Sequence, residues 1–391
     1  MKKVKLALSK IVSNLPVLHL SQKAYGLITI NDKKYFVPGT LPGDVINVYF
    51  PESQELESSY RVLKLERIVQ PSPLRIKPRC QHQTECNGCP LMPLQYEDQL
   101  KIKFEHLIYQ FKRIGLSNQL TKIKNIIPAK DIYGYRNRGQ FKVNSTSIGY
   151  AHPEKKGIIA IDQCPVLTRN CQEFLKEINE SLPREDFRPG EDFPWNFIDF
   201  NEDTHFNNFS LNKRLPFRQG NSKQNENMKS WMREKIRKLN IDPEDIICEL
   251  FCGSGNFTEV VSEMGFQKIK AFEVQGEALD ELKARKLPGV EVFESDLFKS
   301  NAWKSMEHVL NQTRLIILDP PRSGLRYQRA WFKNRPQLKS IIYISCQSES
   351  FVRDLAEILK LGFEIVEIVP IDLFPHTLHL EILCLLKKVS S

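Results

Sequence analysis

The sequence predicts an α/β protein in which a small β-barrel precedes a mostly parallel sheet covered by helices. Two observations support this fold class. From about residue 240, apolar runs such as IICELF, KIKAFEV, RLIILDP and SIIYISC alternate with helical stretches, the pattern of a parallel sheet that is buried on both faces. The first part of the chain instead carries short alternating segments such as AYGLITI and DVINVYF, separated by turn residues.

The chain has 391 residues, which is long enough for two or three domains with separate cores. We expect the barrel in residues 1–70 and a central, irregular and partly β domain in residues 71–216. The α/β domain then occupies residues 217–391. Each of these boundaries rests on a change in pattern along the chain.

Two further elements follow from spacing. Apolar residues that include Leu107 and Phe111 recur at helical intervals over about 93–115, and we expect this helix to pack on the C-terminal domain. The last two apolar runs, FEIVEIV and LEILCLL, are joined by a segment too short for a crossover helix. They should therefore pair antiparallel.

Composition limits the location and the partners. A formal charge of +9 and an isoelectric point near 8.9 favour a polyanionic partner, although a solvated basic surface would give the same balance. No apolar run is long enough to cross a bilayer, and lysines interrupt the N-terminal stretch that resembles a signal peptide. We therefore expect a cytoplasmic protein.

Three cysteines lie close together in RCQHQTECNGCP, namely Cys80, Cys86 and Cys89. The total of nine cysteines is odd, and in a reducing compartment cysteines serve ligation, catalysis or packing rather than disulfides. Spacing alone suits either tetrahedral zinc or an iron-sulfur cluster, and both need a fourth ligand.

A glycine turn follows the first apolar run of the α/β domain, with Gly253 and Gly255 in CGSGNF. Thr258 stands where a dinucleotide fingerprint has its third glycine, which weakens an NAD interpretation. Glu273 ends the next strand and Asp296 is expected to end the third, where carboxylates can accept hydrogen bonds from ribose hydroxyls. Together they indicate an adenosine-bearing ligand without a cradled pyrophosphate, for which S-adenosylmethionine is the natural candidate.

Three further residues could carry chemistry. Asp319 in LDPPRSGL should emerge at the carboxyl edge of the sheet, and the next strand delivers Cys346 to the same edge. A cysteine at a strand end is commonly an inert small hydrophobe. Glu381, in FPHTLHLE, would be an ordinary solvated carboxylate unless its strand borders the same pocket.

A thiol and a carboxylate in one pocket match a particular reaction. A thiolate that attacks C6 of a pyrimidine makes C5 nucleophilic, so that C5 can take a methyl group from a sulfonium donor. A base must then remove the C5 proton before the enzyme is released. Cys346 fits the role of the nucleophile and Glu381 that of the base.

The ordered motifs CxxxxxCxGC, FxQxN, CGSGNF, DPPRSGL, SC and FPHTxHxE resemble the RNA uracil-5-methyltransferases, specifically their iron-sulfur branch acting on 23S ribosomal RNA. The resemblance covers nearly the whole chain. It implies a Rossmann-like class I methyltransferase domain, an N-terminal TRAM domain of the OB-like type that binds RNA, and a central α+β domain with a [4Fe-4S] cluster.

The resemblance also assigns residues. It implies Cys346 as nucleophile, Glu381 as base, and Cys164 in AIDQCPVL as the fourth cluster ligand beside Cys80, Cys86 and Cys89. The implied contacts to S-adenosylmethionine are Gln219, Phe251, Asn256, Glu273, Asp296 and Asp319. The other four cysteines, Cys171, Cys248, Cys252 and Cys384, are interpreted as buried or incidental.

Two departures from the family pattern and two alternatives remain. Gln347-Ser348 replaces the usual Asn-Pro after the nucleophile, and Asn87-Gly88 replaces a Gly-Gly in the cysteine loop.

We expect a monomer with no DNA or membrane partner. Its expected substrate is RNA, and among RNAs it is 23S ribosomal RNA. The alternatives are a tRNA uracil-54 methyltransferase and a non-catalytic RNA-binding assembly factor.

Overall fold

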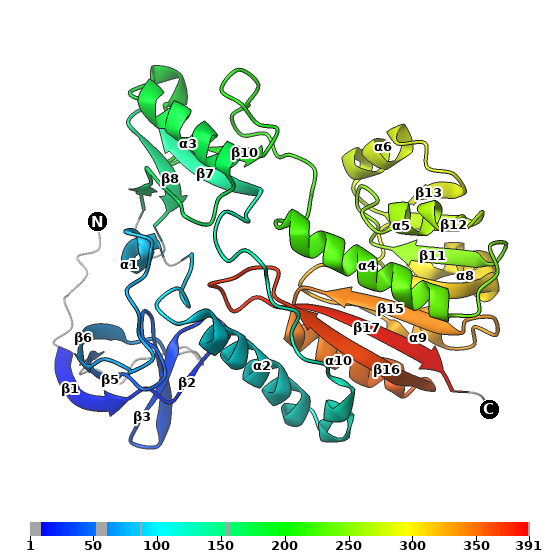
Figure 1. Cartoon of the computed structure of the whole chain (residues 1–391), viewed down its shortest axis with the longest axis horizontal. Helices are drawn as coiled ribbons and strands as arrows, with labels where there is room; N and C mark the ends of the chain where they lie inside the picture. The colour runs from blue at the N-terminus through cyan, green and yellow to red at the C-terminus, as the bar shows by residue number, and fades with distance from the viewer. Residues whose placement is uncertain (1–8, 52–60, 87, 153–155, 192, 390–391) are drawn as a thin grey trace.

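The computed structural model places three β-rich regions in order along the chain, joined by long helices (Figure 1). It describes residues 9–51, 61–86, 88–152, 156–191 and 193–389. Within this part of the chain, no helix is both long and apolar enough to cross a bilayer.

The N-terminal region consists of two three-stranded antiparallel sheets, ordered β1-β5-β6 and β2-β3-β4. Val17, Ile28 and Val48 belong to the buried core that the two sheets share. The strands are β1 (Ser9–Pro16), β2 (His19–Leu20), β3 (Gly26–Ile30), β4 (Lys33–Val37), β5 (Val45–Pro51) and β6 (Lys64–Gln70). Short strands are present as predicted, whereas the assignment to the TRAM type stays a prediction.

The central region is a four-stranded antiparallel sheet ordered β10-β7-β8-β9, and α3 packs on it around Phe174 and Leu175. The strands are β7 (Arg138–Asn144), β8 (Ser147–Ala151), β9 (Ile158–Ala160) and β10 (Asn196–Asn201). The helices from the cysteine segment onward are α1 (Gln83–Cys86), α2 (Tyr96–Arg113), η1 (Ser117–Lys122), α3 (Arg169–Ser181) and η2 (Glu185–Phe187).

The C-terminal region is a seven-stranded sheet ordered β13-β12-β11-β14-β15-β17-β16. Its strands are β11 (Ile246–Leu250), β12 (Ile269–Glu273), β13 (Val290–Glu294), β14 (Thr313–Leu318), β15 (Ser340–Ser345), β16 (Phe363–Ile371) and β17 (Glu381–Lys388). Strands β11 to β15 are parallel, and β17 pairs antiparallel with both β15 and β16. The predicted parallel sheet and the antiparallel last pair are therefore confirmed.

Helices cover both faces of this sheet (Figure 1). The helices of this region are α4 (Ser222–Lys238), α5 (Thr258–Glu263), α6 (Gly276–Ala284), α7 (Ala302–Ser305), α8 (Glu307–Gln312), α9 (Gln328–Phe332) and α10 (Ser348–Leu359). Helices α4 and α5 pack on one face, and α7 to α10 pack on the other.

Helix α2 belongs to the same layer as α7 to α10, although it comes before the central sheet in sequence. Its Leu107 and Phe111 are fully buried in the core that α10 and the sheet form. The buried Lys103 of α2 pairs with the buried Asp372 at 2.5 Å. The predicted helix over about 93–115 therefore does pack on the α/β sheet, while the exact domain boundaries stay a prediction.

Candidate active site

A cavity of about 1270 Å³ opens at the carboxyl edge of the parallel sheet. In the strand order β13-β12-β11-β14-β15, the direction of connection reverses between β11 and β14. Ligands of open α/β sheets bind in the crevice at such a reversal. Residues of β7 and β10 in the central sheet form the opposite wall, so the cavity lies between two regions of the chain.

The turn after β11 holds an unusual backbone. Phe251, Gly253 and Gly255 all have positive φ, at 65°, 53° and 88°. A left-handed conformation costs a residue with a Cβ atom about 1–2 kcal/mol. At Gly255, a Cβ atom would also lie 2.4 Å from Leu282, so this position requires glycine. The turn therefore places its own backbone and the Phe251 ring at the cavity. The centroid of the Phe251 ring lies 5.6 Å from the centroid of the Phe298 ring.

Glu273 fastens this turn to the end of β12. Its Oε2 accepts a hydrogen bond from the Gly253 amide at 3.1 Å, and its Oε1 accepts from the amides of Val274 and Gln275. A carboxylate has about four acceptor positions, so the group retains capacity for a ligand hydroxyl. Glu273 therefore lies at the end of β12 and at the cavity, and its contact to a ribose stays a prediction.

The residues predicted to contact the cofactor do not all reach the cavity. The five that line it are Gln219, Phe251, Asn256, Glu273 and Asp319. Asp296 does not line it, because its Oδ1 accepts a hydrogen bond from the Phe298 amide at 3.0 Å, within its own turn. Its neighbours Ser295 and Leu297 line the cavity instead.

Cys346 and Glu381 lie next to each other across two strands. Ser345 of β15 pairs with Ile382 of β17, so the next opposed positions are Cys346 and Glu381. Directly opposed residues of antiparallel strands have Cβ atoms about 5 Å apart and share a face of the sheet. Both side chains line the cavity, and Glu381 is only 3% exposed.

Burial and neighbouring carboxylates control ionisation here. Burial raises the pKa of the Cys346 thiol to about 12, Glu381 and Asp319 add to this, and Arg322 opposes it. Burial raises the pKa of Asp319 to about 7 and, with Asp319 nearby, raises the pKa of Glu381 well above its usual range. A cationic ligand in the cavity would offset this repulsion and favour the ionised forms.

Sequence reasoning missed the buried acidic residue Glu249, although an acid inside the apolar run IICELF was a signal; it does not itself line the cavity. Glu249 lies on β11, is 1% exposed and accepts a hydrogen bond at 2.6 Å from the Thr258 hydroxyl. Its Oε1 has no partner among the described residues. Burial raises the pKa of Glu249 to about 8, and the charges of Asp319 and Glu273 also raise it.

We expect Glu249→Gln to change how stability depends on pH. In the unfolded chain the carboxyl has its ordinary pKa of 4.5, so its contribution to stability is complete below that pH and is lost as pH rises toward 8. The free energy of unfolding of the wild type should fall relative to the variant by up to ~1.4 kcal/mol per pH unit across this window. Chemical denaturation at several pH values measures this, and parallel curves for the two proteins would contradict it.

The DPPRSGL loop, which carries Asp319 and Arg322, is fixed to helix α10. Asp354 of α10 is fully buried and accepts hydrogen bonds from the Leu325 amide at 2.6 Å and from the Tyr343 hydroxyl at 2.7 Å. Gly324 lies directly against this carboxylate with φ +74°, and a Cβ atom there would stand 2.3 Å from Asp354 Oδ2. The loop geometry therefore depends on glycine at this position.

We expect Gly324→Ala to lower the free energy of unfolding by at least about 2 kcal/mol, because the left-handed backbone and the close contact both penalise a side chain. Gly276→Ala is the matched control, since Gly276 begins helix α6 and no atom lies within 4 Å of its Cβ position. The control should be neutral or slightly stabilising. Thermal unfolding of both variants measures the difference, and equal midpoints would refute this account of the loop.

Gln347, which stands where the family has asparagine, does not line the cavity. Its side-chain amide instead hydrogen-bonds Glu349 in the first turn of α10. The same carboxylate accepts a hydrogen bond at 3.1 Å from Gln110 of α2. In this structure Gln347 therefore joins α10 to its surroundings rather than facing a bound base.

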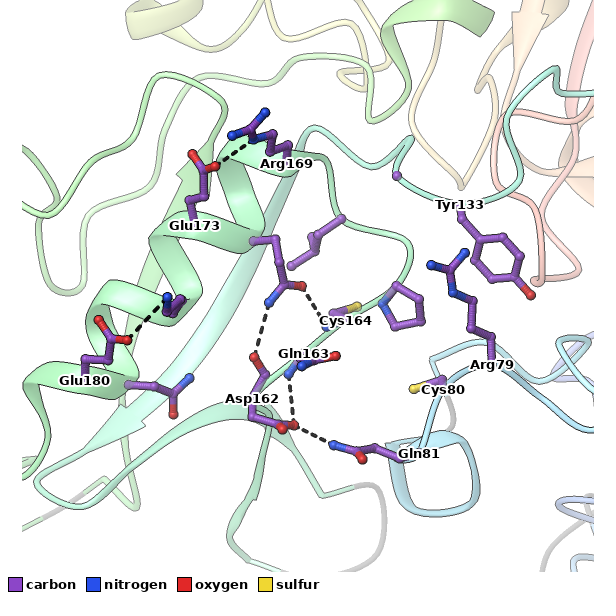
Figure 2. Close-up of a pocket in the computed structure, with 16 residues that line it drawn as sticks. Arg79, Cys80, Gln81, Tyr133, Asp162, Gln163, Cys164, Arg169, Glu173 and Glu180 are labelled. Carbon is purple, nitrogen blue, oxygen red and sulfur yellow. Dashed lines mark hydrogen bonds and ion pairs between the residues drawn. The ribbon is translucent and has the colours of Figure 1, made fainter.

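Two of the four predicted cysteine ligands, Cys80 and Cys164, line a second cavity, of about 910 Å³ (Figure 2). Burial raises the pKa of the thiols of Cys80, Cys86 and Cys89, that of Cys89 to about 12, and the charge of Cys164 raises all three further. In each pair of these four cysteines, the charge of one thiol therefore affects the ionisation of the other. Yet across the described residues, no three His, Cys, Asp or Glu side chains are arranged to hold a metal ion.

The remaining cysteines fit their prediction in part. Cys171, Cys248, Cys252 and Cys384 are all buried, and Cys252 additionally borders the active-site cavity. Cys346 is only half-buried, which agrees with a residue that opens to a ligand.

The strand order, the cavity at the strand reversal and the acidic residues after β12 and β14 define the class I methyltransferase fold. The tRNA (uracil-54, C5)-methyltransferase of Pyrococcus abyssi, solved in complex with S-adenosyl-L-homocysteine, has the same overall fold. Its structure aligns with 97% of this chain and 100% of its own, at a TM-score of 0.65 and 20% identity.

Relatives by sequence identify the family. An uncharacterized RNA methyltransferase of Nitrosomonas europaea is 36% identical over 372 residues, 94% of each chain. The 23S rRNA (uracil(1939)-C(5))-methyltransferase RlmD of Shewanella woodyi is 25% identical over 95% of each chain, and the Pyrococcus abyssi tRNA enzyme is 27% identical over 93% of this chain and 97% of its own. A model of the tRNA (uracil-5-)-methyltransferase family matches residues 298–389. The chain belongs to the RNA (uracil-C5)-methyltransferase family.

Proposed function

We propose that this enzyme methylates C5 of a uridine in RNA by covalent catalysis, with Cys346 as nucleophile and Glu381 as base. The observation that carries the proposal is the opposed position of these two residues on β15 and β17 within one cavity. A non-catalytic assembly factor would have no use for a thiol and a buried carboxylate so placed.

The two residues would act in sequence. The Cys346 thiolate adds to C6 of uracil, and the electron pair displaced from the C5–C6 bond moves toward the C4 carbonyl. S-adenosylmethionine supplies the methyl group that C5 then takes. Glu381 removes the proton from C5, the C5–C6 double bond re-forms, and the thiolate leaves. Burial raises the pKa of Glu381, so the positive charge of the bound cofactor would be needed to favour the ionised form that accepts the C5 proton.

The cavity fits S-adenosylmethionine through the chemistry of its side chains. Glu273 offers carboxylate oxygens to the ribose hydroxyls, and Phe251 offers a ring for the adenine. Asp319 would face the sulfonium, whose positive charge would favour the ionised form of this carboxyl against the burial that raises its pKa to about 7. The full set that we propose to hold the cofactor is Gln219, Phe251, Asn256, Glu273, Asp296 and Asp319. Asp296 would act through the turn that it holds.

For the RNA target we propose 23S ribosomal RNA. Support comes from the resemblance of the ordered motifs. The chain is also similar over nearly its full length to a relative named as a methyltransferase of uracil 1939 in 23S ribosomal RNA. Residues 1–70 would add an RNA-binding surface of the TRAM type. The uridine must be turned out of its stem, because C6 is inaccessible in a stacked helix. The tRNA enzyme of Pyrococcus abyssi matches over a similar length, so tRNA uridine 54 is the second candidate.

Nucleoside mapping separates the two targets. Ribosomal RNA and tRNA from cells that lack the gene are digested, and 5-methyluridine is located by mass spectrometry. We expect loss of one or more 5-methyluridines in 23S ribosomal RNA and an unchanged level in tRNA. Loss in tRNA alone would transfer the proposal to the second candidate, and unchanged levels in both would refute it.

We further propose that Cys80, Cys86, Cys89 and Cys164 hold a [4Fe-4S] cluster. Support comes from the spacing of the three cysteines in RCQHQTECNGCP and from their proximity to Cys164, whose charge contributes to the raised pKa of the Cys80, Cys86 and Cys89 thiols. The cluster would carry no electron in the proposed reaction and would join the cysteine segment to the loop of Cys164.

Purification without oxygen tests the cluster. We expect a brown protein with about four iron atoms and with visible charge-transfer absorption, and Cys164→Ser should lose the colour. A colourless wild-type protein with stoichiometric zinc would overturn the assignment.

A further inference from the structure

The segment that leads to Glu381 is held in an unusual way. Five consecutive backbone carbonyls, those of residues 372–376, each accept a hydrogen bond from a part of the chain outside the β16–β17 pair. In the order of the carbonyls, the donors are Gln224 Nε2 (2.7 Å), Asn221 Nδ2 (3.1 Å), Lys103 Nζ (3.0 Å), the Tyr135 hydroxyl (3.0 Å) and the Leu91 amide (2.9 Å). The donors come from four separate stretches of sequence.

Gln99 of α2 holds the end of this segment most tightly. It is fully buried, its Oε1 accepts a hydrogen bond from the His376 amide at 2.8 Å, and its Nε2 lies 3.1 Å from His376 Nδ1. Its Nε2 also donates to the Leu94 carbonyl at 2.9 Å. His376 has φ +67°, a left-handed conformation that surrounding contacts must maintain.

These contacts fix a loop both of whose ends lie at the active site. Ile371 and Glu381 are paired on β16 and β17, so the chain leaves the sheet beside the proposed base and returns to it at the base itself. His379, on the returning part, lines the cavity. Displacing a catalytic group by about 1 Å is enough to cost about 100-fold in rate.

We infer that Gln99 and Tyr135 are positioning residues that set the orientation of Glu381 for removal of the C5 proton. The inference rests on the proposed function. The Tyr135 hydroxyl is buried and bonds the Pro375 carbonyl, while Gln99 fixes His376 by its backbone and its ring. Neither residue lines the cavity, so neither would touch a ligand there. Tyr135 also packs beside Cys80, Cys89 and Cys164.

The test uses the full-length protein with Tyr135→Phe, which removes one oxygen atom, and Gln99→Met, which removes both of its contacts to His376. Tyr109→Phe is the matched control, because Tyr109 lies on α2 and is 58% exposed. Each variant receives RNA with ordinary uridine and S-adenosylmethionine. Methyl transfer in the first turnover, release of product and covalent protein–RNA complex on denaturing gels are measured separately.

We expect both variants to transfer the first methyl group at nearly the wild-type rate and to release product about 10-fold more slowly or worse. A covalent complex should therefore accumulate with ordinary uridine, which a general loss of stability would not cause. Tyr109→Phe should behave as the wild type. Wild-type release, or an equal loss of methyl transfer and release, in both variants would overturn the inference.

Glu381→Gln is the reference variant that distinguishes failure of the positioning role of Gln99 and Tyr135 from failure of the proposed function. If this variant accumulates the complex while Tyr135→Phe and Gln99→Met do not, the positioning role alone is wrong. If Glu381→Gln transfers methyl groups but accumulates no complex, the assignment of Glu381 as base is wrong, and if it neither transfers methyl groups nor forms a complex, the proposed function fails.

Discussion

Replacement of Cys346 by alanine is expected to lower methyl transfer by about 10,000-fold or more and to prevent any covalent bond between protein and RNA. Loss of a nucleophile in a covalent mechanism removes the pathway itself, so the residual rate is that of binding and orientation alone. Unmodified uracil C5 is too weak a nucleophile to react at a useful rate. Transfer of a labelled methyl group to RNA in a single turnover measures the effect.

The control for this variant is Cys171→Ala. Cys171 is also buried, but it lies on helix α3, packs in the core of the central region and does not line the cavity. It should retain activity within a few fold of the wild type. Measurable catalysis by Cys346→Ala, at even one hundredth of the wild-type rate, would show that the sulfur is not the nucleophile.

Replacement of Glu381 by glutamine should give the opposite pattern, a protein that starts the reaction and cannot finish it. The amide keeps the size of the side chain but cannot accept the C5 proton, so product release should slow by about 100- to 10,000-fold. One methyl group per enzyme should be transferred, and the methylated RNA should stay bound to Cys346. A denaturing gel with labelled cofactor detects this complex.

Glu277→Gln, on the exposed surface of helix α6, controls for the loss of a negative charge and should turn over normally. If Glu381→Gln releases methylated RNA at the wild-type rate, another group removes the proton. Asp319 would then be the candidate, since burial raises its pKa to about 7 and it lines the same cavity.

The α/β sheet could be predicted from sequence because its signals are local. The apolar runs of β11 to β15 are each bounded by turn residues, and the short connection before β17 excludes a crossover helix. That geometry also brought Cys346 opposite Glu381, since strand ends at one sheet edge are neighbours whatever the intervening sequence. Local pattern therefore predicted the pair proposed for catalysis.

Other parts could not be predicted, because they depend on contacts between distant residues. Nothing in the sequence of α2 indicated that Lys103 and Gln99 would pair with Asp372 and His376, some 270 positions later. The hydrogen bonds to the 372–376 carbonyls are likewise set by tertiary packing. Spacing predicted Asp296 at the end of its strand, whereas β13 ends at Glu294 and the Asp296 carboxylate accepts a hydrogen bond within the turn that follows.

The cavity wall is a further example. Spacing located the acids at the sheet edge, but the opposite wall comes from β7 and β10 of the central sheet, whose sequence pattern is irregular. Arg138 of that wall lies 5.4 Å from the ring of Phe217, a contact between two regions that no periodicity predicts. Shape at this wall would decide which RNA is accepted.

The central claim is that Cys346 and Glu381 act on one uracil, and an RNA that contains 5-fluorouridine tests it most directly. Fluorine at C5 cannot leave as a proton, so the reaction should stop after methyl transfer with the base still attached to the enzyme. After digestion with nuclease and trypsin, we expect a methylated fluorouracil nucleotide on the peptide of residues 340–353, which contains Cys346. A peptide without the nucleotide, or the nucleotide on another cysteine, would contradict it.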